Sequence, residues 1–213
     1  MKKLVLLFLI LSFGVKSQEI ISPLISNSKL QNNIRNFSES KSSLSIPFVD
    51  DFSSNSFYPD SNLWQDNSVF INRNYGVNPI TIGVATFDGL NSNGRAYDMT
   101  LTATDSENAD TLNSQKIDLS DADTAYLMFY YQAQGNGNDP QTTDSLILEF
   151  SEGTDSSGNE IWNTIWKKEG SAFHDFKKFV HVFSDIKYLS SEFNFRFRNL
   201  ATVSGNFDHW NID

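Results

Sequence analysis

Apolar and polar side chains alternate over short stretches of the chain from position 44 onward. In residues 193–198, phenylalanine occupies every second position and Asn or Arg fills the positions between. Residues 127–131 and 146–150 repeat the pattern with Leu, Phe and Tyr. Because successive side chains of a strand point to opposite faces, each stretch predicts a β-strand with one apolar face. Similar runs predict strands over residues 44–48, 69–72, 80–87, 117–119, 161–167, 176–183 and 207–212.

The segments between these runs are rich in Gly, Asn, Asp and Ser, as in residues 88–89 and 135–140, and such residues favour turns. No helical stripe of useful length is present, and residues 185–192 offer at most one short helical turn. A single sheet of about ten strands would leave one aromatic face in water, so two sheets must pack together. We therefore expect an all-β fold, a two-sheet antiparallel β-sandwich.

The N-terminus has the three parts of a secretory signal peptide. Two lysines follow the first methionine, and residues 4–13 form an apolar run too short to span a bilayer. Val15 and Ser17 are the small residues that a signal peptidase requires. A membrane anchor is the alternative, but Lys16 interrupts the apolar run. We expect residues 1–17 to be removed on export.

The rest of the chain divides into two parts. Residues 18–43 are polar and lack a sustained period, which predicts an arm or linker. Residues 44–213 form the sandwich, and because residues 211–213 still alternate, we expect the domain to be truncated at its C-terminal end. The chain has no cysteine, which excludes disulfides, a lipid-modified cysteine, thiolate metal sites and cysteine nucleophiles. The core must supply the stability, and 18 phenylalanines are available for it.

The chain is strongly acidic. Its formal net charge is −10, and removal of three lysines with residues 1–17 takes it to −13 (−10 − 3). Such a surface repels nucleic acid and anionic lipid, so we expect neither as a partner, and no other segment is apolar enough for membrane insertion. An acidic surface outside the cell suits hard cations such as Ca²⁺.

An ordered set of residues carries a family resemblance: 48–52, 83–89, Gly94, Tyr97, 127–132, Gly135, 144–150, Trp162, Trp166, 195–199 and 205–213. Taken in order, these segments resemble a MAM-type, concanavalin-like jelly roll. More closely, the chain is similar to modules of large secreted Bacteroidetes proteins of the gliding-motility and type IX secretion kind, which often carry further repeats and a C-terminal sorting domain. The paired cysteines of animal MAM domains are absent, and no sorting domain lies within these residues.

Several aspartates are candidates for a structural calcium site. Asp51 follows the first predicted strand and Asp213 ends the last, and these two strands commonly lie side by side in a jelly roll. The resemblance adds Asp88, where MAM-type domains have an acidic residue. We predict a structural Ca²⁺ bound by Asp51, Asp88 and Asp213. The alternative is that these residues cap turns, which is common for Asp.

Other side chains were weighed for sugar binding and catalysis. Aromatic rings on a sandwich can stack on sugars, although most are expected in the core. Glu149 and Glu152 are the nearest approach to a glycosidase carboxylate pair, but no middle Asp joins them. No Gly-x-Ser-x-Gly motif exists, and the histidines lack metal-ligand spacing. We expect no catalytic residues and no enzyme. The candidate aromatics are Trp64, Trp162, Trp166, Trp210, Tyr130 and Tyr131.

Arg196 and Arg198 share one face and could bind an acidic glycan or a partner's carboxylate, but neutralisation of neighbouring acids is the preferred interpretation. The main hypothesis is a non-catalytic extracellular module for adhesion or protein–matrix contacts, secreted or on the outer cell surface. The alternative is a carbohydrate-binding module attached to a secreted polysaccharide-degrading enzyme. The expected partners are an extracellular protein or glycan, besides the secretion machinery that reads the signal peptide.

Overall fold

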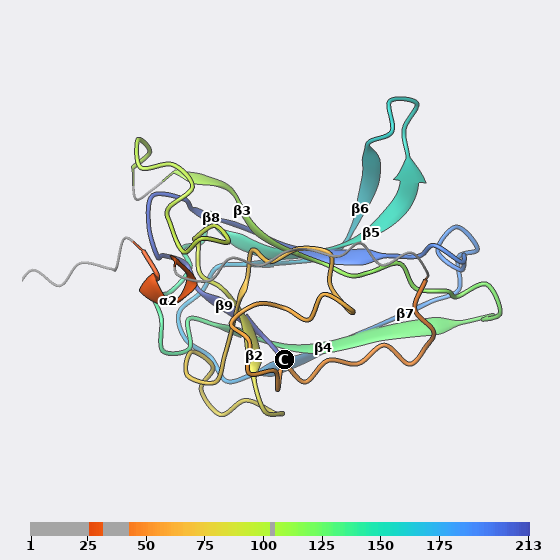
Figure 1. Ribbon diagram of the computed structural model, residues 1–213, viewed down its shortest axis with the longest axis horizontal. Coiled ribbons are helices and arrows are strands. Elements are labelled where there is room, and N and C mark those ends of the chain that lie inside the picture. Colours follow the sequence, from red (N-terminus) through yellow and green to blue (C-terminus); the bar gives the residue numbers. More distant parts are fainter. Residues whose placement is uncertain (1–25, 32–42, 103–104) are drawn as a thin grey trace, which may run out of the picture.

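The protein is a two-layer antiparallel β-sandwich, as Figure 1 shows. The computed structural model describes residues 26–31, 43–102 and 105–213. The expected fold class is confirmed. One sheet has the order β1 (Phe70–Asn72), β2 (Val84–Phe87), β9 (Trp210–Ile212), β4 (Ala125–Ala133), β7 (Lys177–Phe183). The other has the order β3 (Ser106–Asn113), β8 (Phe195–Thr202), β5 (Ser145–Thr154), β6 (Glu160–Glu169).

The chain changes sheet at most of its connections. Only β1 to β2 and β5 to β6 join strands that are paired neighbours in one sheet. The β5–β6 hairpin projects beyond the body of the sandwich (Figure 1). β9 lies between β2 and β4, pairing Ile212 with Ala85 on one side and with Tyr131 on the other. This jelly-roll-like strand order places the end of the described chain inside a sheet.

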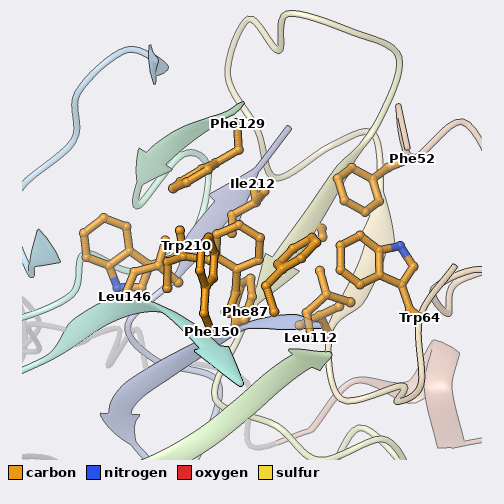
Figure 2. Packing of buried hydrophobic residues seen from close by; sticks show 14 of the residues in the cluster. Phe52, Trp64, Phe87, Leu112, Phe129, Leu146, Phe150, Trp210 and Ile212 are labelled. Carbon is orange, nitrogen blue, oxygen red and sulfur yellow. The ribbon is translucent and has the colours of Figure 1, made fainter. Parts of the chain in front are cut away.

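The space between the sheets is filled by the apolar positions of the alternating runs. In β8, Phe195 and Phe197 are buried, whereas Arg196 and Arg198 stay partly exposed on the outer face. Phe150 and Trp210 are fully buried and lie together in the cluster shown in Figure 2. Burial of aromatic side chains contributes about 25 cal/mol for each Å² removed from water, so this cluster stabilises a chain without crosslinks.

The structure differs from the predicted elements in several places. Residues 44–48 and 117–119 are not strands, and a single bridge joins Leu44 to Ile117. In residues 80–87 only Val84–Phe87 is a strand. β3 was not predicted, because its sequence is mostly polar and only Asp110 and Leu112 are buried in it. A strand at the edge of a sheet needs little apolar surface of its own.

Part of the N-terminal arm contacts the sandwich. The short helix α2 (Ser28–Gln31) buries Leu30 in a small cluster with Tyr58 and Phe70. The predicted signal peptide, residues 1–17, lies outside the described residues. Within the described part of the chain, no helix has the length and apolar character needed to cross a bilayer.

Candidate functional site

The four tryptophans occupy different environments. Trp64 is 3% exposed and Trp210 is fully buried, so both belong to the core (Figure 2). Trp166 also points between the sheets, where its ring centre lies 4.8 Å from that of Tyr131. Trp162 instead lies on the outer face of the four-stranded sheet, partly exposed beside Arg196. It is the one tryptophan placed to meet a ligand.

A β-bulge separates Trp162 from Trp166. Residues four apart on a regular strand share one face. In β6 the register slips, because Leu148 pairs with Trp166 but the next residue of β5, Glu149, pairs with Thr164. The extra residue, Ile165, turns Trp166 into the core and leaves Trp162 outside. The sequence contains no signal that could have revealed this slip.

An ion-pair network lies beside Trp162 on the same outer face. The Arg196 guanidinium stacks over the Trp162 ring, 4.1 Å from its centre, and its Nε donates to Glu149 Oε2 at 2.6 Å. Arg198 Nη2 donates to Glu149 Oε1 at 2.8 Å, and its Nη1 donates to Asn108 Oδ1. Burial tends to raise the pKa of Glu149, but its bonds to both arginines outweigh burial and lower the pKa. The expectation that the arginines neutralise nearby acid agrees with this geometry.

Further polar groups extend this face toward the edge strand β3. Asp66 accepts hydrogen bonds from Thr111 Oγ1 at 2.8 Å and from Asn113 Nδ2 at 2.7 Å. Burial of Asp66 raises the pKa of its carboxyl to about 7, although the hydrogen bonds from Thr111 and Asn113 act to lower it. We call the surface formed by Trp162, Arg196, Arg198, Glu149, Asn108, Asp66, Thr111 and Asn113 the Trp162 face. Its donors and acceptors are held by strands and by one another, so it is rigid.

Two of the three predicted calcium ligands lie close together. Asp213 accepts hydrogen bonds from the backbone N–H groups of Ile80 and Thr81, at 2.6 and 2.9 Å. The Thr81 hydroxyl donates to Asp213 Oδ1 at 2.7 Å, and its oxygen also lies 3.2 Å from the main-chain oxygen of Asp51. The Asp51 carboxylate accepts the N–H of Ser53 and so caps a turn. Both side chains are occupied as local hydrogen-bond acceptors.

The third predicted ligand, Asp88, lies at the opposite end of β2. β2 pairs Ala85 with Ile212 and Phe87 with Trp210, so Asp88 follows the strand end far from Asp213. The three predicted ligands therefore do not meet at one point. The register between β2 and β9 places Asp88 and Asp213 at opposite ends of β2, and the sequence does not show that register.

Asp88 instead forms a buried acidic pair with Asp110, a residue that sequence reasoning missed. Both carboxyls are fully buried. Asp110 accepts hydrogen bonds from the Gly89 N–H and the Tyr97 hydroxyl, each at 2.9 Å, and Asp88 Oδ1 accepts the Leu90 N–H. Asp88 Oδ2 has no hydrogen-bond partner. Burial, with the charge of Asp110, raises the pKa of Asp88, and burial raises that of Asp110 to about 7.

Main-chain oxygens gather next to this pair. A Cβ placed on Gly89 would lie 3.0–3.2 Å from the carbonyl oxygens of Thr202, Gly205 and Phe207. Gly89 has a φ of +70°, so only glycine fits here without strain. Ca²⁺ favours oxygen ligands of this mixed kind, carboxylate and carbonyl. Carboxylate and carbonyl oxygens are thus neighbours at residues 88–89, although nowhere in the described residues do three His, Cys, Asp or Glu side chains gather into a metal-binding group.

The residues weighed for catalysis have other partners. Glu149 is held by the two arginines, and Glu152 forms an exposed ion pair of 2.8 Å with Lys187. Each histidine packs against a different aromatic ring: His209 on Tyr75, His174 on Tyr131 and His181 on Phe150. Burial lowers the pKa of His209 to about 4, so its ring is neutral at physiological pH.

Comparisons with known proteins give distant likenesses of fold. No protein-family model and no curated protein matches the chain. A solved structure titled "Family 16 Carbohydrate Binding Module-2" is 12% identical, with a TM-score of 0.37, and covers 71% of this chain and 89% of that one. CBM27-1 of Caldicellulosiruptor saccharolyticus, solved with mannohexaose, is 8% identical, with a TM-score of 0.36, and covers 68% of this chain and 79% of that one. The narrower resemblance to MAM-type modules stays a prediction.

Proposed function

We propose that this chain is a non-catalytic, extracellular glycan-binding module whose Trp162 face holds a sugar chain. The sequence hypothesis of a carbohydrate-binding module is thus preferred to that of an adhesion module. Export rests on the signal-peptide pattern of residues 1–17. The ligand proposed is a neutral polysaccharide, because Glu149 already engages both arginines of the face and the chain as a whole is acidic.

The observation that carries the proposal is the position of Trp162. The Arg196 guanidinium covers one face of the partly exposed Trp162 indole, so we place the C–H face of a sugar ring against the opposite face of the indole. Around it, the partly exposed Arg196 and Arg198 and the exposed Asn108 can meet the hydroxyls of the sugar. Because these groups are fixed before a ligand arrives, little side-chain entropy is lost on binding.

Replacing Trp162 by alanine is expected to abolish this binding without unfolding the domain. Loss of the stacking surface should weaken affinity for a bound polysaccharide at least tenfold, while the melting temperature changes by only a few degrees. The measurement is a glycan array followed by calorimetric titration with the best polysaccharide. Binding should also change the fluorescence of wild-type protein through Trp162.

Phe173→Ala provides the matched control. Phe173 is 44% exposed and lies between β6 and β7, away from the Trp162 face, so its removal should leave binding intact. Trp162→Phe keeps a stacking ring and should retain part of the affinity. The proposal would be rejected if the wild-type protein bound none of the neutral or acidic polysaccharides tested. It would also be rejected if Trp162→Ala and Phe173→Ala lost the same amount of affinity.

A protein partner is the second candidate, and one surface favours it. On the outer face of the five-stranded sheet, Tyr126 pairs with Val182 and Met128 with Val180. These four side chains are 45–72% exposed and form an apolar area. Exposed apolar areas of this kind often mark protein contacts. The glycan array separates the two candidates, since a protein-binding module would be silent on it.

We further propose that the buried acidic pair holds a structural Ca²⁺. Asp88, Asp110 and the main-chain oxygens of Thr202, Gly205 and Phe207 would be its ligands. A bound cation would stabilise two carboxylates that otherwise lie close together and out of water. What supports this proposal is the unpartnered, fully buried Asp88 Oδ2 and the convergence of three carbonyl oxygens on Gly89, the next residue.

Calcium is expected to raise the melting temperature relative to EDTA by about 5–10 °C, because saturation at 100 times the Kd contributes about 2.7 kcal/mol. The effect should depend on pH. Both carboxyls have raised pKa values in the folded state, so without metal they favour folding below about pH 4, and this contribution is lost as pH rises toward about 7. The measurement is thermal unfolding with Ca²⁺ or EDTA from pH 4 to pH 8, and calcium should matter most at the neutral end.

Two isosteric variants locate the site. Asp88→Asn should remove the calcium response and, in EDTA at neutral pH, be at least as stable as wild type because the repulsion with Asp110 is relieved. Asp51→Asn should keep the calcium response. If Asp51→Asn loses it and Asp88→Asn retains it, the cation belongs at the other end of β2. Identical thermal unfolding curves of the wild type in Ca²⁺ and in EDTA would contradict the proposed calcium site.

A further inference from the structure

Three side chains from distant parts of the sequence meet at one end of the four-stranded sheet. Lys116 Nζ donates to Glu160 Oε1 at 2.9 Å and to the side-chain oxygen of Asn194 at 3.2 Å. The side-chain nitrogen of Asn194 donates to the same oxygen of Glu160 at 3.4 Å. An amine, a carboxamide and a carboxylate are therefore in mutual hydrogen-bond contact.

The backbone fixes the lysine and the asparagine relative to one another. Ile117, which follows Lys116, donates its N–H to the carbonyl oxygen of Phe193 at 2.7 Å, and Phe193 precedes Asn194. The carbonyl oxygen of Asn194 accepts the N–H of Ser151 at 3.1 Å. The Asn194 side chain is fully buried, so its carboxamide has little freedom to turn away from the lysine.

The carboxamide carbon of Asn194 lies within reach of the lysine nitrogen. A carbonyl carbon is about 1.23 Å from its oxygen, so Asn194 Cγ is at most about 4.4 Å from Lys116 Nζ. Reacting atoms in a productive geometry are about 3–3.5 Å apart, a separation that rotation of the flexible lysine stem can reach. Glu160 Oε1 contacts both nitrogens, the one that must lose protons and the one that must gain a proton.

We propose that Lys116 and Asn194 become joined by an intramolecular amide bond, with Glu160 as the proton carrier. The Lys116 ammonium passes one proton to Glu160, and its neutral nitrogen then attacks Asn194 Cγ. The Nζ–Cγ bond forms and the Cγ–Nδ2 bond breaks, and Nδ2 takes the proton from Glu160 and leaves as ammonia. Glu160 accepts the second proton that Nζ loses and passes it to the ammonia. The products are an amide and an ammonium ion, and nothing is oxidised or reduced.

Such a bond would brace a chain that has no cysteine and hence no disulfide. It would join residues 78 apart in the sequence and connect the segment after β3 to the start of β8. Closing a loop of this length restricts the unfolded chain and should raise the melting temperature by about 10 °C. The side chains of Lys116 and Glu160 are 37% and 32% exposed, so the ammonia can leave to solvent. None of the three residues belongs to the Trp162 face, so this inference does not depend on the proposed function.

Mass spectrometry of the purified protein tests the proposal. The wild type should be about 17 Da lighter than the mass calculated from its determined N-terminus, because one ammonia is lost. Asparagine followed by glycine, as at residues 93–94 and 136–137, can also lose ammonia, so the modified position must be mapped. Tryptic digestion should leave residues 96–167 uncut at Lys116 and joined to residues 188–196.

Lys116→Arg keeps the positive charge but provides no nucleophilic amine, so it should have the full calculated mass and melt about 10 °C below the wild type. Glu160→Gln keeps the shape of the side chain but cannot carry the proton, and it should also stay unlinked. Lys187→Arg alters the exposed ion pair with Glu152 and is the matched control, which should keep the link. Full calculated mass of the folded wild type after several days of incubation would overturn the proposal. Persistence of the joined peptides or of the mass loss in Lys116→Arg would overturn it too.

Discussion

Phe150→Ala is expected to lower the free energy of unfolding by about 3–5 kcal/mol, the range found when a buried aromatic leaves a cavity. Phe150 is fully buried, and its ring centre lies 5.0 Å from that of Phe183 and 4.9 Å from that of Phe193. Phe183 belongs to β7 of the opposite sheet, so Phe150 joins the two layers. Urea unfolding should show a lower midpoint with an unchanged slope.

Two further substitutions show whether the loss comes from the cavity. Phe150→Leu keeps most of the volume and should cost less than about 1.5 kcal/mol. Phe173→Ala removes an exposed ring of the same kind and should change the stability by less than about 0.5 kcal/mol. A loss below 1 kcal/mol for Phe150→Ala would contradict the assignment of this ring to the centre of the core.

Period-two burial made the fold class predictable. Phe195 and Phe197 are buried as the alternation predicts, and the neighbouring Arg196 and Arg198 stay partly exposed. β3 escaped prediction because its sequence offers one buried apolar residue, Leu112, and its other buried side chain is the carboxyl of Asp110. An edge strand gains its position from the partner strand that it pairs with, and that partner lies far away in the sequence.

The candidate site was less predictable, because it depends on register. Thr81 contacts the main-chain oxygen of Asp51 and the carboxylate of Asp213, but residues 44–48 form no strand beside β9, whose neighbours are β2 and β4. Asp88 is separated from them by the length of β2, and its buried partner Asp110 lies in the strand that was missed. The sequence contains no pattern that joins these two aspartates.

The Trp162 face illustrates the same limit. On a regular strand Trp162 would share a face with Trp166, and only the bulge at β6 separates them. By contrast, the arginines were expected to neutralise an acid, and strand pairing sets Glu149 directly opposite Arg196. The sequence therefore indicated which kinds of side chain could form a site. Which side chains contact one another depends on the strand register of the two sheets, and the sequence does not show that register.

Glu149→Gln is expected to lower the free energy of unfolding by about 2–3 kcal/mol at pH 7. The substitution keeps the shape of the side chain but leaves Arg196 and Arg198 without their carboxylate. Breaking a fully buried ion pair costs about 3–5 kcal/mol. We expect the smaller loss of about 2–3 kcal/mol here because the side chains of Arg196 and Arg198 are still 21% and 18% exposed. The measurement is urea unfolding of both proteins.

The pH dependence of this difference identifies its cause. The folded-state pKa of Glu149 is lowered from its ordinary value of 4.5, so its stabilising contribution is present above pH 4.5 and lost as pH falls through the folded pKa. The difference between wild type and Glu149→Gln should shrink as pH falls below 4.5 and vanish below the folded-state pKa of Glu149. Glu152→Ala, which removes the exposed partner of Lys187, should show no measurable change at any pH. A Glu149→Gln difference that stayed constant down to pH 3 would mean that packing, not the ion pair, holds the Trp162 face together.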